Sequence, residues 1–325
     1  MTDVSRIVER IVRKTGLPGL VDALTDLGAS DLQSLLLDVY RRRAEAGSVG
    51  GLVDRYRKSR FTKPSANAPQ HFVALDALAY RLLPEGFEAI ELSPVAPFGA
   101  TSMVAGTSQN RIVSTIRNSE VAADSTNALA LECAVRRSAL LEDDPRSHAP
   151  VKLAASQRLV RAQEFKEERH TAHFRLFGLC TAGRDAGSFG FELEQLNEHA
   201  GFHVALVKGW LAHCGTSASI RVPVTALEDG PPADVVEERV IAPLAERHPD
   251  VEPFLFPERE QGIGYYRKAC FHVYVEAPDG TPVQLADGGL TDWTQQLVGS
   301  RKERLMISGI GTEGLVGIFA SELPA

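Results

Sequence analysis

Two adjacent tyrosines are the side chains best placed for chemistry in the C-terminal third of this 325-residue chain. Tyr265 and Tyr266 follow a turn with glycines at 262 and 264, and they precede an alternating aromatic and β-branched run at residues 269–275. Glycine permits tight backbone geometry and close approach to a ligand, and the run has the composition of a strand. The sequence therefore predicts a loop feeding a strand, with two phenols at the junction that either line a pocket or pack in the core.

A second candidate is Arg161, which precedes a short charged loop and then His170, His173 and Phe174. A guanidinium is a forked cation, so it can hold two oxygens of a phosphate or carboxylate while negative charge develops there. The alternatives are an ordinary surface arginine and a core phenylalanine. The order arginine, loop, histidine, phenylalanine favours a ligand-binding hairpin.

Bulk composition excludes several classes of protein. With 44% hydrophobic and 24% charged residues, the chain suits a globular protein with a sizeable core. The net charge of −7 argues against general nucleic-acid binding. No run of 18 apolar residues and no secretory signal is visible, so we expect neither a membrane span nor export. The four cysteines are scattered, which predicts reduced thiols in a cytoplasmic protein and no metal site.

Apolar periodicity divides the chain into two regions. Residues 1–65 read as an N-terminal helical region, with a helix N-cap expected at Ser30–Asp31. Residues 63–69 read as a linker. The main domain, residues 70–325, opens with a helix ending near Leu82, and a strand is expected over residues 86–95.

Three blocks of the main domain, at residues 261–266, 284–292 and 307–315, resemble the C-terminal half of a histidyl-tRNA synthetase catalytic domain in order and spacing. That family has an Arg-Gly-Leu-x-Tyr-Tyr loop, then Gly-Gly-Arg-Tyr-Asp, then Gly-x-Gly-x-Glu-Arg-Leu. The motifs are degenerate here. Gln261 stands at the catalytic arginine, Leu290-Thr291 replaces Arg-Tyr, and Gly314 stands at the ATP-binding arginine.

The resemblance also covers residues 158–174 and implies a role for each matching side chain. Arg161 and Gln261 take the catalytic positions. The implied nucleotide contacts are Arg161, Gln163, His170, Phe174, Gly309, Gly311 and Glu313. The implied substrate contacts are Thr126, Glu132, Tyr265, Tyr266, Gly288 and Gly289. ATP and Mg²⁺ are the implied candidate cofactors, and no metal-ligating residues are assigned.

The implied fold is α+β, a class II aminoacyl-tRNA synthetase-like antiparallel sheet flanked by helices. Residues 203–250 fall where the family carries an inserted subdomain, and no anticodon-binding domain is expected. The resemblance implies a homodimer formed through the first helix and strand of the main domain. In design the chain is similar to the regulatory subunit of ATP phosphoribosyltransferase.

The missing arginines leave three hypotheses for function. The chain is a paralogue without tRNA-charging activity that binds an amino acid or related metabolite, or a nucleotide, and acts through a protein partner. Alternatively, it is an ATP-dependent ligase that adenylates a small carboxylate for an acceptor other than tRNA. The third hypothesis is an interaction module without a ligand site. Losing one group that stabilises transition-state charge typically costs ~10²–10³ in rate, which favours the first hypothesis.

Overall fold

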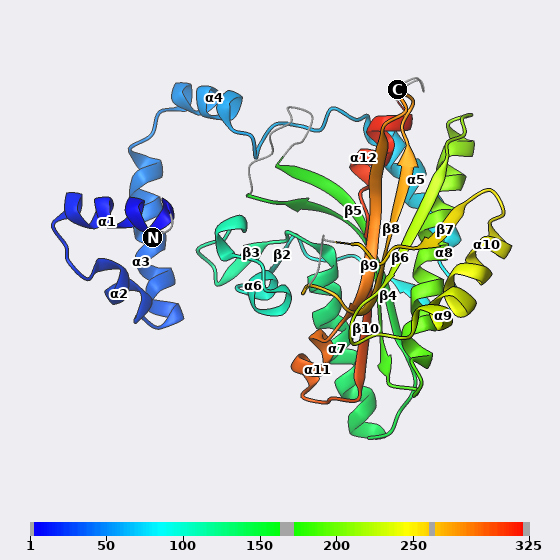
Figure 1. Ribbon diagram of the computed structural model, residues 1–325. Helices are drawn as coiled ribbons and strands as arrows, with labels where there is room; N and C mark the ends of the chain where they lie inside the picture. The colour runs from blue at the N-terminus through cyan, green and yellow to red at the C-terminus, as the bar shows by residue number, and fades with distance from the viewer. Residues whose placement is uncertain (1–2, 163–171, 260–263, 321–325) are drawn as a thin grey trace. The chain divides into compact units, whose positions relative to one another are not determined.

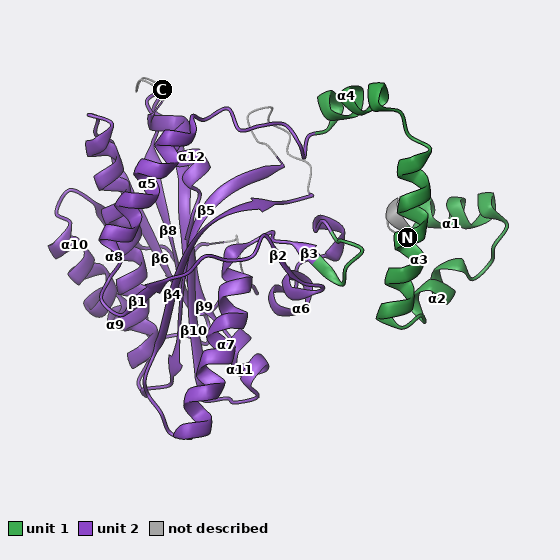
Figure 2. Cartoon of the chain, turned by 180° about the vertical axis from the view of Figure 1, so that it is seen from behind, with its two compact units in different colours: residues 1–59, 114–119 green, residues 60–113, 120–325 purple. Residues whose placement is uncertain are grey.

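The computed structural model describes residues 3–162, 172–259 and 264–320. The chain divides into two compact units, one of residues 1–59 and 114–119 and the other of residues 60–113 and 120–325 (Figure 2). None of the helices in the described ranges is long and apolar enough to cross a membrane.

The first unit is helical, with α1 (Asp3–Thr15), α2 (Leu20–Thr25), α3 (Ala29–Glu45) and α4 (Val49–Lys58). Gly28 is the N-cap of α3, so the cap expected at Ser30–Asp31 is wrong. The helix starts earlier, and Asp31 lies in its first turn, where a carboxylate faces the positive end of the helix dipole. Helices α2, α3 and α4 bury no residue.

An eight-stranded sheet in the order β1-β4-β5-β10-β9-β8-β6-β7 organises the second unit (Figure 1). The two edge pairs, β1–β4 and β6–β7, are parallel, and the other neighbours are antiparallel. This confirms the predicted mostly antiparallel sheet. The strands are β1 (Phe87–Ala89), β4 (Val151–Val160), β5 (His173–Arg184), β6 (Ile220–Ala226), β7 (Glu252–Leu255), β8 (Arg267–Glu276), β9 (Pro282–Thr291) and β10 (Glu303–Ile310).

Helices cover both faces of this sheet (Figure 1). The core on one face joins the sheet to α5 (Pro69–Leu82), α8 (Gly190–His213) and α12 (Thr312–Phe319). The core on the other face involves α7 (Ser125–Asp143) and α11 (Trp293–Val298), which pack on β4, β5 and β10. Each helix presents an apolar stripe at helical spacing, as Phe72, Leu75 and Ala79 do on α5.

The strand expected over residues 86–95 is shorter than predicted. Only β1 pairs in the large sheet, and the chain leaves that sheet after the Ile90 N–H donates to the carbonyl of Ala154 (2.9 Å). Pro94 has no N–H to continue a ladder. The next strand, β2 (Val95–Pro97), pairs instead with β3 (Ser119–Val121) in a separate two-stranded sheet.

Residues 203–250, expected as an inserted subdomain, are built into the sheet and its helical layer. They supply the end of α8, strand β6, α9 (Ala233–Val236), a π-helical turn at Glu237–Ile241 and α10 (Ala242–Arg247). Strand β6 pairs with both β7 and β8.

Two buried polar clusters lie within the second unit. Arg137 on α7 and Glu303 on β10 form a fully buried ion pair, with Nε and Oε2 2.7 Å apart. On the other face of the sheet, Ser308 Oγ lies 2.8 Å from both His199 Nδ1 and His203 Nε2. Burial lowers the pKa of both imidazoles, to about 3 for His203. Both histidines are therefore neutral, and the pair serves the core of the fold.

Candidate functional site

A cavity of about 420 Å³ lies where the start of α7 meets strands β5, β9 and β10 and the two tyrosines that precede β8. Its volume falls in the range of small-molecule sites. The segment of α6 (Ala100–Ala105) and the 3₁₀ turn Gln109–Arg111 supplies a further wall. Of the residues predicted from the sequence to bind ligands, these line it: Thr126, Arg161, Phe174, Tyr265, Tyr266, Gly309 and Gly311.

Glu120 holds the wall formed by residues 99–109. Its buried carboxylate accepts hydrogen bonds from the backbone N–H groups of Gly99 (2.9 Å) and Thr101 (2.8 Å) and from the side chain of Gln109 (3.1 Å). Burial alone would raise the pKa of Glu120, but these hydrogen bonds outweigh it and lower the pKa. The wall is therefore pinned by an ionised carboxylate.

Tyr266 and Asp287 form one side of the cavity. Tyr266 directly precedes β8, and its hydroxyl donates to Oδ2 of Asp287 on β9 across 2.9 Å. Burial raises the pKa of Asp287, the hydrogen bond from Tyr266 opposes this, and the charge of Asp124 adds to it. Tyr265 packs edge-on against Tyr266, with ring centroids 4.9 Å apart, and against Trp293. The two phenols therefore both line the cavity and complete a small aromatic cluster.

Arg161 and Asp124 form a second polar pair in the cavity lining. Arg161 Nη2 lies 3.2 Å from Asp124 Oδ2, and Arg161 Nε donates to the carbonyl of Ala123 (2.9 Å). The guanidinium carbon lies 4.8 Å from the centroid of the Phe174 ring, a cation–π arrangement. Asp124 is also the N-cap of α7 and accepts from the N–H of Thr126. The predicted anion-binding arginine is thus already paired with a carboxylate.

Asn127 offers hydrogen-bonding groups to the cavity that no described residue uses. The side chain lines the cavity and is 2% exposed, yet neither its Nδ2 nor its Oδ1 has a hydrogen-bond partner among the described residues. A buried amide without partners costs free energy, so such a group points to a ligand or a bound water.

Other predicted residues lie elsewhere. A Cβ on Gly288 would come within 2.4 Å of Ser308 Cβ, and one on Gly289 within 2.6 Å of the Tyr266 ring. Both glycines are needed for close packing within the sheet. Glu132 accepts from Arg136 (2.8 Å) and is absent from the cavity lining. From this part of the chain, Asp124 is the carboxylate that faces the cavity.

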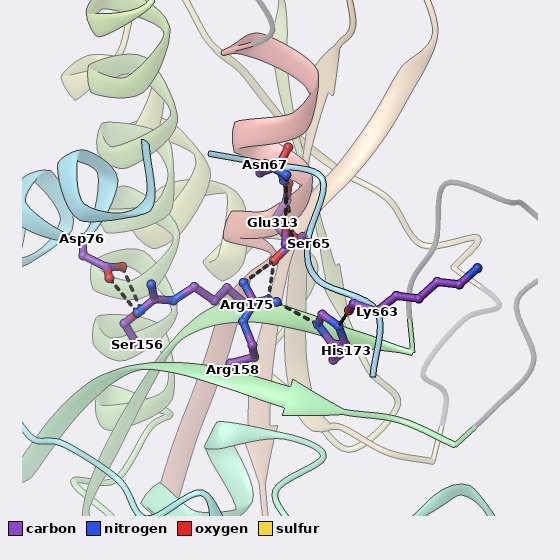
Figure 3. A network of polar contacts seen from close by, with 9 residues as sticks. All are labelled: Lys63, Ser65, Asn67, Asp76, Ser156, Arg158, His173, Arg175 and Glu313. Carbon is purple, nitrogen blue, oxygen red and sulfur yellow. Dashed lines mark hydrogen bonds and ion pairs between the residues drawn. The ribbon is translucent and has the colours of Figure 1, made fainter. Parts of the chain in front are cut away.

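Glu313 is occupied by a polar network (Figure 3). Its carboxylate accepts from Ser65 and from the N–H of Arg175 (3.2 Å), and it pairs with Arg158 (3.1 Å). Asn67 donates to the carbonyl of Glu313 (3.0 Å). The network fastens the linker to β5 and α12, so the Glu313 carboxylate is committed to protein groups.

The remaining predicted residues, Gln163, His170 and Gln261, fall outside the described residues. Asp124, Asn127 and Asp287 are cavity residues that sequence reasoning did not select. Asp287 lies inside a block that resembles the synthetase motifs, and Asp124 is of a residue type that commonly caps helices and directly precedes α7. Neither signal indicates that the side chain enters a cavity.

The sequence matches no protein-family model and no curated protein. Solved structures show the fold: this is a class II aminoacyl-tRNA synthetase-like core. The histidyl-tRNA synthetase of S. aureus superposes with a TM-score of 0.54 and 14% identity, covering 78% of this chain and 65% of the synthetase. The chain therefore spans less than two thirds of that enzyme's length.

Two further structures share the fold. A protein from Bacillus halodurans C, described as an ATP phosphoribosyltransferase regulatory subunit/histidyl-tRNA synthetase, gives a TM-score of 0.58 at 14% identity and covers 81% of this chain and 83% of its own. A structure described as the RNA binding domain of threonyl-tRNA synthetase from Cryptosporidium parvum Iowa II gives a TM-score of 0.54 at 10% identity, covering 78% of this chain and 65% of its own.

The side chains described around the cavity fit a triphosphate poorly. The lining includes two arginines, Arg111 and Arg161, and two aspartates, Asp124 and Asp287. Asp124 already engages Arg161, and Gly314 brings no charge to the start of α12. Within the described ranges, no group of three His, Cys, Asp or Glu side chains is placed to hold a metal ion.

Proposed function

We propose that this protein is a histidyl-tRNA synthetase-like paralogue that binds an amino acid or a related small zwitterion and does not charge tRNA. The observation that carries the proposal is the pairing of charges around one cavity. Asp287 is suited to an ammonium group and Arg111 to a carboxylate, whereas Asp124 and Arg161 pair with each other. The amide of Asn127 and the hydroxyls of Thr126 and Tyr266 add polar partners.

The charge of the ligand distinguishes an amino acid from a nucleotide at this site. A zwitterion carries one charge of each sign, which matches the Asp287 carboxylate and the Arg111 guanidinium that line the cavity beside the Arg161–Asp124 ion pair. A triphosphate would bring several negative charges close to Asp124 and Asp287, and like charges in a partly desolvated site repel. Adenylation also needs cations that stabilise the transition state, and Arg161 is held by Asp124.

We further propose that the protein acts as a regulatory or partner subunit and forms a homodimer. The likeness to a structure described as an ATP phosphoribosyltransferase regulatory subunit supports the first part. The test is whether the protein, with and without its amino acid, changes the activity of an ATP phosphoribosyltransferase catalytic subunit from the same source. Light scattering after size-exclusion chromatography measures the molar mass and so tests whether the protein is a dimer.

Calorimetric titration tests which class of ligand the protein binds. The twenty amino acids and ATP–Mg²⁺ are titrated separately, and we expect one or a few amino acids to bind and ATP to bind weakly or not at all. Tyr266→Phe should weaken binding of the amino acid by about tenfold, because it removes the hydroxyl that donates a hydrogen bond to the Asp287 carboxylate. Tyr56→Phe, on an exposed tyrosine of α4, is the matched control.

ATP–pyrophosphate exchange separates the binder from a ligase. No exchange is expected with any amino acid that binds. Exchange that depends on one amino acid would replace the proposal with the ligase hypothesis. If neither an amino acid nor ATP binds, the interaction-module hypothesis takes its place.

A further inference from the structure

The Asn127 amide is a polar group of the cavity that takes no part in the charge pairs there. Asn127 is the third residue of α7 and lines the cavity. Its side chain is 2% exposed, and neither Nδ2 nor Oδ1 has a hydrogen-bond partner among the described residues. Bulk water does not satisfy a side chain that is buried to this extent. The unpaired donor and acceptor therefore cost the folded protein free energy until a bound group pairs with them.

The polar side chains next to Asn127 are already engaged. Thr126 Oγ1 donates to Asp124 Oδ1 across 2.8 Å, and Asp124 Oδ2 lies 3.2 Å from Arg161 Nη2. Asn127 differs from these three neighbours in the cavity lining, because within the described ranges its donor and its acceptor are both unused. A ligand that enters the cavity gains most by pairing with this amide.

The two charged ends of an amino acid have other partners in the cavity. Asp287 on β9 is suited to the ammonium group, and Arg111 in the 3₁₀ turn is suited to the carboxylate. Asn127 comes from a third segment, the start of α7. With the charged ends of the ligand held by the other two segments, the Asn127 amide is left for the ligand's side chain.

The donor and acceptor of Asn127 select among side chains. An ionised carboxylate accepts but does not donate, and an ammonium or guanidinium group donates but does not accept, so each leaves half of the amide unpaired. A hydroxyl carries both functions on one atom, and a neutral imidazole carries them on opposite sides of its ring. A carboxamide has its N–H and its C=O side by side, so it pairs with both groups of Asn127 at once.

We infer that the ligand of this cavity is an amino acid whose side chain ends in a carboxamide, as in glutamine and asparagine, and that Asn127 determines this specificity. The inference rests on the proposed function and deepens it. Asn127 Nδ2 donates to the amide oxygen of the ligand, and Asn127 Oδ1 accepts from the ligand's amide N–H. A site that hydrogen-bonds its ligand in this way rejects analogues without the partner, because its own buried groups are then left unpaired.

Calorimetric titration of the full chain with matched amino acids tests the specificity. Glutamate replaces the amide of glutamine with a carboxylate of the same shape, and methionine is an apolar side chain of similar length. We expect glutamine or asparagine to bind at least about tenfold more tightly than its matching acid and than methionine. Equal affinities would overturn the inference. If another amino acid binds and neither amide does, the inference fails while the proposed function stands; if no amino acid binds, both fail.

Asn127→Leu tests which residue reads the amide. Leucine is close to asparagine in size and leaves no unpaired polar group, so the variant should fold. We expect glutamine binding to weaken by about tenfold or more and methionine binding to be unchanged, so that the preference is lost. Gln296→Leu, which removes an exposed amide from α11, is the control and should keep the preference. Equal weakening of every amino acid would place Asn127 at the part that all amino acids share and overturn the inference.

Asn127→Asp should change the preference instead of removing it. A carboxylate in the first turn of a helix is favourable, so α7 should be preserved. An ionised aspartate accepts but does not donate, so it suits the ammonium group of ornithine, whose side chain has a reach similar to that of glutamine. We expect the affinity for glutamine relative to ornithine to fall by about tenfold or more. An unchanged ratio would contradict the assigned role of Asn127.

NMR of the Asn127 side chain gives a direct readout on the unmodified protein. The two amide proton signals are assigned by their loss in Asn127→Leu. Saturating glutamine should shift these signals and slow the exchange of the protons with water, because the ligand's oxygen accepts a hydrogen bond from them. Methionine is the control and should leave the exchange rate unchanged. Unchanged Asn127 signals in the presence of saturating glutamine or asparagine would overturn the inference.

Discussion

The Tyr266 hydroxyl donates a 2.9 Å hydrogen bond to Asp287 Oδ2 and so places a phenol and a carboxylate side by side in the wall of one cavity. Burial raises the pKa of Asp287, which means that the folded protein holds its proton more readily than the unfolded chain does. Between the ordinary pKa and the raised one, folding stability therefore falls as pH rises. The carboxylate opposes stability at neutral pH and is suited to a ligand's ammonium group.

Asp287→Asn should accordingly stabilise the protein and weaken its amino-acid ligand. The free energy of unfolding at pH 7 should rise because the substitution removes a carboxyl group whose pKa is raised by folding, while affinity for the ligand should fall by about tenfold or more. Urea denaturation and calorimetric titration measure the two effects. Asp234→Asn, on an exposed aspartate, is the control. A variant that is less stable and binds normally would refute this role for Asp287.

Asp124→Asn should free Arg161 without unfolding α7. Asparagine is as good an N-cap as aspartate, so the helix start is preserved. With its carboxylate partner gone, Arg161 should bind anions better, and we expect AMP or phosphate affinity to rise by several-fold. Glu132→Gln serves as the control, because that carboxylate contacts Arg136. Equal anion affinity in the wild type and Asp124→Asn would show that the pair does not limit Arg161.

Arg137→Met should be strongly destabilising. It removes the partner of fully buried Glu303 and the donors to the carbonyls of Ala149 and Ser147. Breaking one side of a buried ion pair typically costs about 3–5 kcal/mol. Chemical denaturation measures the loss. The double variant Arg137→Met/Glu303→Leu should be more stable than Arg137→Met alone, because no uncompensated charge remains. Additive losses would argue that the pair is not coupled.

His203→Gln should flatten the acid side of the stability profile. The pKa of His203 is about 3 when folded, against 6.5 ordinarily, so between these values only the unfolded chain binds the proton. Folding stability should then fall as pH drops below about 6.5, by ~1.4 kcal/mol per pH unit for this group. Urea denaturation from pH 7 to 4.5 measures the slope. His148→Gln, on an exposed histidine, should keep the wild-type slope.

Much of the fold could be predicted from residue patterns. The strand over residues 269–275 is confirmed within β8, and the arginine–loop–phenylalanine pattern corresponds to the β4–β5 pair, where Leu159 lies opposite Phe174. The strand expected over residues 86–95 is cut short, because a strand lasts only as long as its partner's register and Pro94 cannot donate to a ladder.

The sequence by itself determined the order of the motifs, the alternation of strands and helices, and the absence of arginines at positions 261 and 314. These features depend on local periodicity and on residue identity. Only the tertiary structure decided which side chains meet. Asp124 and Glu132 are eight residues apart on or beside one helix, yet one faces the cavity and the other faces Arg136. Gly288 and Gly289 pack toward opposite faces of the same strand. Charges meet across a cavity through contacts between distant segments, and local patterns carry no record of those contacts.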